Sequence, residues 1–345
     1  MASKIIKIAG LTIGGKNPVR VESMLKTSFD KPFSFVLKEI KSLEKAGCEL
    51  LRVAVPSKEA IPFLNKIKQN TSIPLMADIH FSEEIALRVL DAGIDSIRLN
   101  PANMKLPAIK RIARIAKSKK VPMRIGVNAA SFRNPFGRDK KAVVRLVEIL
   151  CKTVGEIEKE KFYDLIVGIK SSDVMTTILA NELLAKKLSY PIHIGITEAG
   201  LAPEAVIKTS VGLGALLSRG VGNTLRVSLT DTSAKEVEVG YEILKALNLR
   251  KRGIEIISCP TCGRCKINVK KIAEEIKKRT LNINKPTTIA VMGCEVNGPG
   301  EAKEADIGIA GGRNCAILFK KGKIIRKIRE KEIVSALMRE IKNLI

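Results

Sequence analysis

One pattern of apolar and polar residues recurs along the first 250 residues of the chain. A short apolar run is followed by a stretch with apolar residues about every 3.6 positions, and then another apolar run begins. Continuous apolar runs are typical of parallel strands that are buried on both faces. The pattern therefore predicts alternating strands and helices, with strands in VRVES (19–23), ELLRVAV (49–55), PLMADIH (74–80), SIRLNP (96–101), PMRIGVN (122–128), DLIVGIK (164–170), IHIGITE (192–198) and TLRVSLT (224–230).

The number of these units predicts the architecture. Eight strand-and-helix units over about 250 residues match the size of a (β/α)8 barrel. An open doubly wound sheet is the alternative, but no G-x-G-x-x-G follows the first strand, which weakens its dinucleotide-binding version. Ala-Gly at Gly47 and Gly93 predicts left-handed caps at the ends of two helices. We also expect an N-terminal hairpin, Lys4–Ile8 with Leu11–Gly15, to close the bottom of the barrel.

A polar, basic segment, NLRKRG at 248–253, separates this repeat from a second pattern. We therefore predict an α/β protein with a TIM-type barrel at 1–250, followed by a small α/β domain at 251–345. The second pattern predicts strands at 254–257, 288–292 and 307–310, a helix at 269–278, a hairpin through 317–325 and a closing helix from Lys331.

Composition narrows the class of protein. Hydrophobic residues make up 45% of the 345, without tryptophan, so the core must be aliphatic. No stretch approaches the roughly 20 apolar residues of a membrane helix, and the start is too short and too charged for a secretory signal. We expect a soluble cytoplasmic protein without a membrane partner. A net charge of +26 favours anionic partners, although most lysines suit a solvated surface.

Five basic residues interrupt strands that otherwise look buried: Arg52, Arg98, Arg124, Lys170 and Arg226. An unpaired charge in such a place costs several kcal/mol, so something must compensate it. In a barrel the C-terminal ends of the strands converge on one mouth, where guanidinium groups can match phosphate oxygens in pairs. We predict a rim of cations around an anionic ligand, with polar neighbours at Asp78, His80, Asn128, His193, Glu198 and Ser228.

Internal ion pairing is the alternative for each of these cations. Asp78 and Glu198 are the acids that the pattern offers, and two acids cannot neutralise five cations. Of the two histidines, His80 shares a strand face with Asp78, whereas His193 precedes the centre of its strand and is the weaker candidate. A carboxyl group such as that of Glu198, held in a dry mouth, can have a raised pKa and donate a proton. The alternative for Glu198 is an acid at a helix N-terminus.

The last quarter of the chain concentrates cysteine. Cys259-x-x-Cys262 has metal-ligand spacing, Cys265 extends it, and Cys294 supplies a thiol from a distant loop. A zinc ribbon would need a second C-x-x-C, so an iron–sulfur cluster is favoured and structural zinc is second. A tight turn at 298–300 could return Glu301 to the metal. A carboxylate is more exchangeable than a thiolate, so Cys265 and Glu301 compete for the fourth position. The remaining thiols are interpreted as packing residues: Cys48, Cys151 and Cys315.

These residues together resemble one family closely, the (E)-4-hydroxy-3-methylbut-2-enyl diphosphate synthases of the methylerythritol phosphate pathway, in their bacterial two-domain form. The resemblance covers nearly the whole chain, and its cysteine and NGPGEA motifs are the specific ones. The matching motifs are LRVAVP (51–56), ADIHF (77–81), RLNP (98–101), RIGVNA (124–129), HIGITEAG (193–200), TLRVSL (224–229), SCPTCGR (258–264) and GCEVNGPGEA (293–302).

The resemblance implies a set of site residues. It implies a [4Fe–4S] cluster on Cys259, Cys262, Cys294 and Glu301, with Asn297 beside it and Glu198 as the acid near the reacting carbon. It implies that the substrate diphosphate is bound by Arg52, Asp78, His80, Arg98, Arg124, Asn128, Lys170, Arg226 and Ser228. The chain departs from the family at Glu22 and Leu25, where Gln and Thr are usual, and in having Cys265.

The implied activity is that of an iron–sulfur oxidoreductase in isoprenoid biosynthesis. It would open and dehydroxylate 2-C-methyl-D-erythritol 2,4-cyclodiphosphate, with electrons from ferredoxin or flavodoxin, in a homodimer whose barrel mouth is capped by the partner's cluster domain. A barrel enzyme for another phosphate ester or a pterin, with a structural zinc module, is the alternative. Nucleic-acid binding is disfavoured, because the chain has three tyrosines and no tryptophan as stacking platforms.

Overall fold

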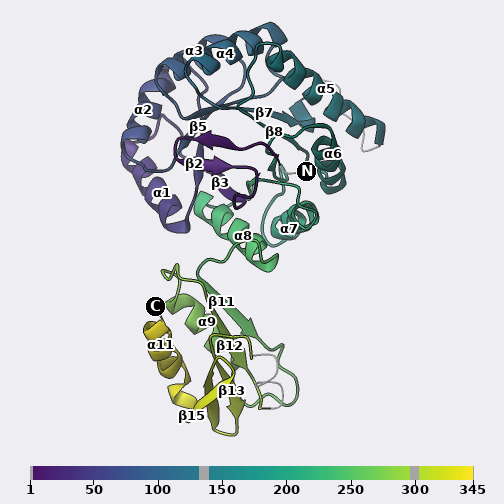
Figure 1. Cartoon of the computed structure of the whole chain (residues 1–345). Helices are drawn as coiled ribbons and strands as arrows, with labels where there is room; N and C mark the ends of the chain where they lie inside the picture. Colours follow the sequence, from purple (N-terminus) through teal and green to yellow (C-terminus); the bar gives the residue numbers. More distant parts are fainter. Residues whose placement is uncertain (1–2, 132–139, 296–302, 345) are drawn as a thin grey trace. The chain divides into compact units, whose positions relative to one another are not determined.

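The computed structural model describes residues 3–131, 140–295 and 303–344 (Figure 1). The chain divides into two compact units, Met1–Arg250 and Lys251–Ile345. Each unit has its own hydrophobic core, and each is described by itself below.

The first unit is a barrel of parallel strands, as the repeat predicts. Its eight-stranded sheet has the order β8-β7-β6-β5-β4-β3-β10-β9, and a parallel bridge between Val167 and Ile192 brings its two ends together. Apolar side chains from both faces of the strands are buried, which explains the continuous apolar runs. The strands are β3 (Arg20–Met24), β4 (Leu50–Ala54), β5 (Leu75–Ile79), β6 (Ser96–Leu99), β7 (Met123–Asn128), β8 (Leu165–Lys170), β9 (His193–Ile194) and β10 (Thr224–Leu225).

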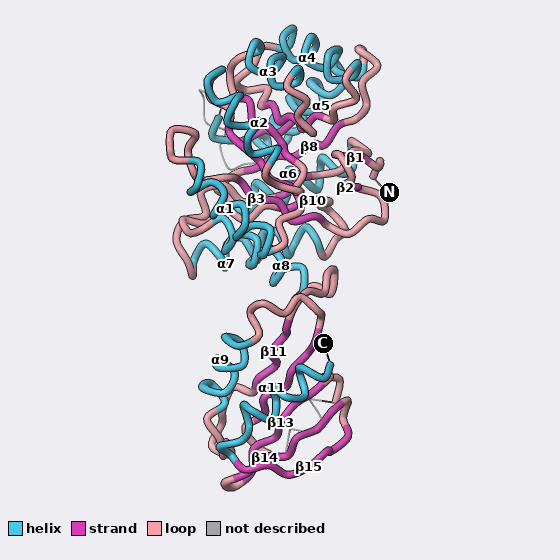
Figure 2. Tube along the Cα trace, turned by 90° about the vertical axis from the view of Figure 1, so that its left-hand side faces the viewer, coloured by secondary structure: helices cyan, strands magenta, loops and turns pink. Residues whose placement is uncertain are grey.

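Helices surround these strands, as Figures 1 and 2 show. Local chemistry sets their ends: Ser82, Asp173 and Thr232 cap helix N-termini by accepting backbone N–H bonds. Gly47 and Gly93 take the predicted left-handed conformation, with φ of 89° and 75°. The helices are α1 (Phe33–Ala46), α2 (Ile61–Gln69), α3 (Glu83–Asp91), α4 (Leu106–Ser118), α5 (Lys140–Glu158), α6 (Val174–Lys187), α7 (Glu204–Leu217) and α8 (Ser233–Ala246), with 3-10 turns at Lys58–Ala60 and Ala129–Ser131.

The predicted N-terminal hairpin is present. Strand β1 (Ile6–Ile8) pairs antiparallel with β2 (Leu11–Ile13), beside the N-terminus in Figure 2. Its buried isoleucines form one apolar cluster with three inward-facing barrel residues, namely Leu50, Met76 and Ile166. Leu50 and Met76 lie at or near the starts of β4 and β5, and Ile166 near that of β8, so the hairpin covers the N-terminal end of the barrel. The opposite, C-terminal end is left for a site.

Within its described residues, the second unit is a five-stranded mixed sheet with two helices. Its order is β11-β12-β13-β14-β15, parallel through β13 and antiparallel beyond it. Ile272, Ile276, Leu337 and Ile341 of its helices share a core with the sheet. Its elements are β11 (Ile254–Ser258), α9 (Val269–Arg279), β12 (Thr287–Met292), β13 (Ile307–Gly312), β14 (Cys315–Lys320), β15 (Lys323–Arg329), a 3-10 turn (Glu330–Glu332) and α11 (Ile333–Leu344).

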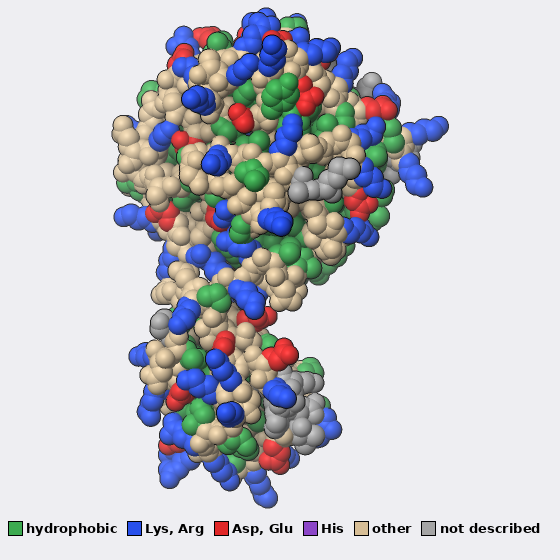
Figure 3. All heavy atoms as spheres, viewed as in Figure 1, with side chains coloured by type: hydrophobic (Ala, Val, Ile, Leu, Met, Phe, Trp, Pro, Cys, Tyr) green, Lys and Arg blue, Asp and Glu red, His purple; other side chains and the backbone are tan. Residues whose placement is uncertain are grey.

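The surface agrees with the composition. Lysine and arginine side chains are scattered over the face seen in Figure 3, as a solvated, basic surface requires. Among the helices of the described residues, none is long and apolar enough to cross a membrane.

Candidate functional site

The C-terminal ends of the barrel strands surround a small pocket that is partly open to solvent. Most of the diphosphate-binding residues named from the sequence meet there, although they come from five different strands or the loops that follow them. The lining consists of Arg52, Arg98, Arg124, Asn128, Lys170, Arg226 and Ser228 from that set, together with Gly126, Val127, Gly168, His193 and Thr197.

Strand register places these side chains side by side. Asp78 of β5 pairs with Arg98 of β6, and Arg98 pairs with Arg124 of β7, so an acid and two arginines stand at one level of the barrel. Two levels higher, beyond the pair Gly126 and Gly168, Asn128 of β7 pairs with Lys170 of β8. Because alternate residues of a strand face the same side, the sequence spacing within a strand indicates which side chains share its inner face.

A glycine makes room for the lysine. A Cβ atom at Gly195 would lie 2.8 Å from the Lys170 amine nitrogen and 2.7 Å from the Arg226 carbonyl oxygen. Any larger residue at this position would push the amine out of its place in the pocket wall.

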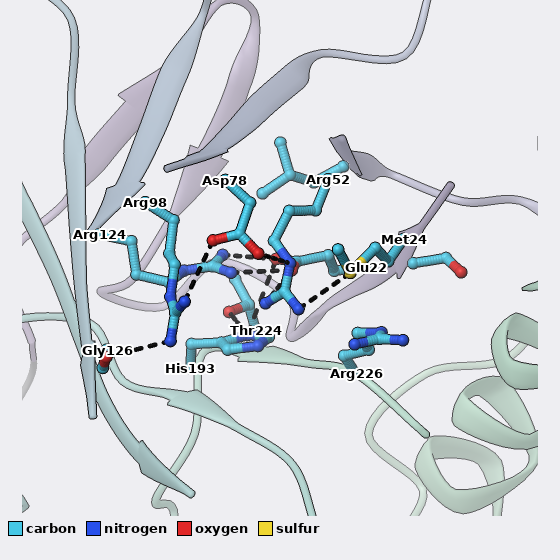
Figure 4. A network of polar contacts seen from close by, with 12 residues as sticks. Glu22, Met24, Arg52, Asp78, Arg98, Arg124, Gly126, His193, Thr224 and Arg226 are labelled. Atoms are coloured by element: carbon cyan, nitrogen blue, oxygen red, sulfur yellow. Dashed lines mark hydrogen bonds and ion pairs between the residues drawn. The ribbon is translucent and has the colours of Figure 1, made fainter. Parts of the chain in front are cut away.

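Below the pocket, carboxylates hold the arginines in place (Figure 4). Glu22 of β3 accepts two hydrogen bonds from the terminal nitrogens of Arg124, at 2.8 and 2.5 Å. Asp78 accepts one from Arg98 at 3.1 Å and lies 3.4 Å from the Nε of Arg52. Burial acts to raise the pKa of Glu22, but Arg124 and then Arg52 outweigh it and hold that pKa below its ordinary value. Burial is likewise outweighed at Asp78, where Arg52, His80 and Arg98 lower the pKa.

This network corrects the expected pairing. The sequence offered Asp78 and Glu198 as internal partners, but the acids that meet the cations are Asp78, Glu22 and Glu236. Glu236 of α8 lies 3.5 Å from Arg226 and 3.0 Å from Lys26. Internal ion pairs are therefore more extensive than the sequence indicated, but three carboxylates still face the five strand cations. The overlooked signal was Glu22, an acid that interrupts the first apolar run.

Several buried donors in this network lack an acceptor. Lys170 is only 8% exposed and makes no hydrogen bond or ion pair with any residue that the structure describes. Burial, followed by the neighbouring Arg52 and Arg226, lowers the pKa of Lys170 well below its ordinary value. The Nε atoms of Arg52, Arg124 and Arg226 are buried and form no hydrogen bond with any described residue. Such donors are costly unless a ligand supplies acceptors.

His193, the weaker candidate from the sequence, lies in the pocket wall. Its side chain is buried, its Nδ1 shares a 2.7 Å hydrogen bond with the Thr224 hydroxyl, and its Nε2 has no partner within the described residues. Burial and then Arg124 hold the pKa of His193 well below 6.5, so the imidazole is neutral at pH 7. His80, the favoured histidine, is 41% exposed at the side chain and does not line the pocket; it contacts Asn103 at 3.2 Å and Asp78 at 3.4 Å.

Glu198 lies at the end of the apolar run that contains β9, and it is exposed to solvent. Its backbone has a φ of 54°, a left-handed conformation that residues other than glycine adopt uncommonly. The structure therefore does not enclose this carboxyl group in a dry pocket, contrary to the expectation from sequence.

The predicted cluster ligands follow the C-terminal ends of β11 and β12. Around Gly293 two sulfurs come close: its N–H donates to the Cys259 sulfur at 3.1 Å, and a Cβ there would lie 2.5 Å from the Cys265 sulfur. Cys262 is exposed, and hydrogen bonds from Arg264 lower its pKa. Cys294 is half-buried in the neighbouring loop. Asn297 and Glu301 lie outside the described residues, and among those described no three His, Cys, Asp or Glu side chains are gathered as a metal site.

The chemistry of these cysteines is suitable for binding an iron–sulfur cluster through thiolates. Backbone N–H groups that donate to sulfur stabilise cluster thiolates and tune their potential. A thiol with a lowered pKa is the better metal ligand. The thiols interpreted as packing residues differ: Cys48 is buried, and burial raises its pKa to about 12. Cys151 is half-buried, and burial raises its pKa as well.

Residues 3–241 match the family described as "GcpE TIM-barrel domain", and residues 255–343 match the family described as "GcpE protein C-terminal domain". Curated relatives are similar over nearly their whole length. The 4-hydroxy-3-methylbut-2-en-1-yl diphosphate synthase (flavodoxin) of Thermodesulfovibrio yellowstonii is 46% identical over 98% of this chain and 97% of its own. The protein of the same name from Clostridium tetani is 44% identical over 98% of this chain and 98% of its own. That from Geobacter sulfurreducens is 45% identical over 99% of this chain and 97% of its own.

Solved structures share the barrel. The dihydropteroate synthase from Xanthomonas albilineans in complex with 7,8-dihydropteroate has a TM-score of 0.52 at 15% identity, over 70% of this chain and 99% of that one. The Yersinia pestis dihydropteroate synthase has a TM-score of 0.52 at 12% identity, over 71% and 97%. At such identities the likeness is one of fold alone, and it lends no support to a pterin as ligand.

Proposed function

The chain belongs to the GcpE family, and from this premise we propose that it converts 2-C-methyl-D-erythritol 2,4-cyclodiphosphate into (E)-4-hydroxy-3-methylbut-2-enyl diphosphate. The reaction takes up two electrons, opens the cyclodiphosphate ring and releases a hydroxyl group as water. The chain is thus an iron–sulfur oxidoreductase of isoprenoid biosynthesis with a [4Fe–4S] cluster.

The surplus of buried donors in the barrel pocket carries this proposal. Five cations share three carboxylates, and the Nε atoms of Arg52, Arg124 and Arg226 lack acceptors among the described residues. A diphosphate brings several oxygens and two or more negative charges into one place. It would satisfy these donors together, whereas a neutral ligand would leave the charge uncompensated.

The residues in and beside the pocket then have two roles, positioning the arginines and binding phosphate oxygens. Asp78 positions Arg52 and Arg98 from below, and His80 lies at its outer edge. This arrangement holds the substrate with its diphosphate fixed and its carbon skeleton toward the open side of the pocket. The groups that would bind phosphate oxygens are Arg52, Arg98, Arg124, Asn128, Lys170, Arg226 and Ser228.

The second unit, 251–345, would hold the cluster through the thiolates of Cys259, Cys262 and Cys294 and the carboxylate of Glu301, with Asn297 beside it. When bound, the cluster supplies single electrons and a Lewis-acidic iron. Glu198 would donate the proton that the departing hydroxyl group needs. Its left-handed backbone is the kind of strained position that recurs at active sites.

The relatives' name points to a flavodoxin as the electron donor of this chain, and ferredoxin is the other single-electron carrier with suitable chemistry. A reducing compartment, the cytoplasm, suits a chain whose seven cysteines are all free.

An exposed apolar face supports a homodimer. Met175 and Leu179 of α6 and Ile207 and Val211 of α7 point outward with exposures of 58%, 36%, 61% and 56%. The α7 sequence, EAVIKTSVGLGALL, is apolar on nearly all sides, as in a helix that is covered on every face. A second copy of the chain would cover α6 and α7, and its cluster unit would close the barrel mouth.

An anaerobic turnover assay tests the proposal. Protein reconstituted with iron and sulfide is given the cyclodiphosphate and a strong small-molecule reductant, and the open diphosphate product is measured by mass spectrometry. We expect product and about four irons per chain. One zinc per chain, or no product from protein with a full cluster, would refute it. Glu198→Gln should bind substrate normally and lose turnover.

A further inference from the structure

Glu22 is the most deeply buried acid beneath the pocket. It is 1% exposed, and both of its oxygens are occupied by the guanidinium group of Arg124, which is itself 1% exposed. This carboxylate lies too deep for any ligand in the pocket to form hydrogen bonds with it. It acts on a ligand only through its charge and through Arg124.

The other neighbours of Glu22 are also pocket groups. Arg52 lies 3.9 Å from one of its oxygens, and the Nδ1 of His193 lies 3.8 Å from the other. Lys170 is near enough to lower the pKa of Glu22 further. Asp78, another acid of the network, is paired with Arg52 and Arg98. Glu22 is therefore the one carboxylate whose described neighbours include Arg52, Arg124, Lys170 and His193 together.

One charge in this position has opposite effects in the two states of the pocket. Without a ligand, Glu22 relieves the mutual repulsion of the cations and stabilises the fold. With a diphosphate bound, the same carboxylate repels the phosphate oxygens through a medium that screens poorly. The free energy that Glu22 contributes to the empty pocket is thus partly lost when the ligand binds.

We propose that Glu22 is an internal counter-anion that weakens diphosphate binding in order to keep the ligand-free barrel stable. The inference rests on the proposed function, since it takes the pocket to be a diphosphate site. Its consequence for the reaction is that Glu22 limits the affinity for both substrate and product, which each carry a diphosphate, so it favours product release.

Glu22→Gln removes the charge and keeps the shape. Inorganic pyrophosphate is the probe, titrated calorimetrically into the full chain with its cluster, at low ionic strength where charge effects are largest. We expect Glu22→Gln to bind pyrophosphate about tenfold more tightly than the natural protein. We also expect its ligand-free thermal unfolding midpoint to fall by about 5 °C. Pyrophosphate should restore more of that midpoint in the variant than in the natural protein.

Glu49→Gln is the matched control. Glu49 is also a partly buried acid with two arginine partners, Arg20 at 2.8 Å and Arg250 at 3.1 Å, but it lies just before β4, at the opposite end of the barrel. The Glu49→Gln variant should have a lower unfolding midpoint and an unchanged pyrophosphate affinity. Glu22→Asp retains the charge, so its affinity should stay within about twofold of the natural protein.

The outcomes separate the two proposals. If the natural protein does not bind pyrophosphate, the pocket is no diphosphate site and the proposed function fails first. If it binds but Glu22→Gln binds equally or more weakly, the counter-anion inference is overturned and Glu22 only positions Arg124. Should Glu22→Gln not fold, Glu236→Gln, which removes the acid 3.5 Å from Arg226, carries the same expectation of tighter binding, and equal or weaker binding there overturns it.

Discussion

The barrel mouth and the cysteine end of the second unit are assembled in different ways. In the mouth, strand register brings Asp78, Arg98 and Arg124 to one level, and the carboxylates hold the cations before any ligand arrives. At the cysteine end, the thiols lie on loops after β11 and β12, and the sulfurs of Cys259 and Cys265 lie close to Gly293. One site is built from strands, and the other is built from loops.

The difference lies in where the stabilising free energy comes from. Buried cations must be compensated within the fold, because each unpaired charge would cost several kcal/mol. Thiols on loops carry no such cost, and the metal itself supplies the free energy that gathers them. Substitutions in the mouth should therefore change both stability and binding. Substitutions at the cysteine end should change cofactor content and leave the barrel as it is.

Loss of a cluster thiol should have the largest effect. Cys259→Ser removes the thiolate that accepts the Gly293 N–H, so we expect at least a thousandfold loss of turnover, less than one cluster per chain and unchanged pyrophosphate binding. Iron analysis, visible absorbance and calorimetry measure the three quantities. Cys151→Ser in α5 is the matched control and should keep its iron. A Cys259→Ser protein with weaker pyrophosphate binding would break the separation of the two sites.

Lys170→Met should separate binding from stability within the mouth. Because the described residues give Lys170 no ion pair, its loss breaks none, and we expect the unfolding midpoint to stay or rise. Pyrophosphate affinity should fall about 100-fold, since a charged hydrogen-bond donor is lost.

Two further variants sharpen this comparison. Arg124→Met should destabilise the fold strongly because it leaves Glu22 buried without the two hydrogen bonds from Arg124. Exposed Lys117→Met should change neither stability nor binding. If Lys170→Met destabilised the protein as much as Arg124→Met, the amine would be part of the internal network rather than free for a ligand.

His193 makes the mouth sensitive to acid. Its pKa is held well below 6.5 in the folded chain, so below pH 6.5 the unfolded chain binds a proton that the folded chain does not. Stability should therefore fall as the pH drops, by up to about 1.4 kcal/mol per pH unit, until the lowered pKa is reached. Glu22 and Asp78, whose pKa values are also lowered, add to this loss below about pH 5.

Urea unfolding between pH 7 and pH 5 measures this slope. His193→Asn retains a polar partner for Thr224 and should lose the contribution of His193. Between pH 7.5 and pH 8.5 the difference in unfolding free energy between the natural protein and His193→Asn should stay constant. An unchanged slope below pH 6.5 in the variant would place the acid sensitivity elsewhere in the chain.

The fold could be predicted from the sequence because it repeats one simple unit. Parallel strands buried on both faces must be apolar throughout, so a charged residue within them, such as Arg98 or Arg124, is visible at once. The N-terminal hairpin lies outside this repeat and was predicted from its own two short apolar runs. The short strands β9 and β10 are only two residues long, so their apolar runs overstate the paired length.

The partners of the cations were harder to predict. Glu236 lies on a helix, where an acid usually faces solvent, but it is buried and accepts hydrogen bonds from Ser23 of β3 and from Leu229, which follows β10. His193 reaches the pocket because β9 begins at this residue, which no periodicity reveals. Periodicity gives the face of an element, whereas pairing between elements depends on distances that only the folded chain fixes.

Cys265→Ser should have the smallest effect, and it tests how strictly the two sites are separated. The Cys265 sulfur donates to the Ile267 carbonyl oxygen at 3.0 Å, a bond that a serine hydroxyl can replace. If Glu301 is the fourth ligand, the variant should keep its iron, its absorbance and its turnover, with stability changed by less than about 1 kcal/mol. Glu301→Ala should then lose turnover while pyrophosphate binding persists. The opposite result, iron lost with Cys265→Ser and kept with Glu301→Ala, would make the cluster all-thiolate. The cysteine end would then be closed to substrate, and the barrel mouth alone would have to account for the chemistry.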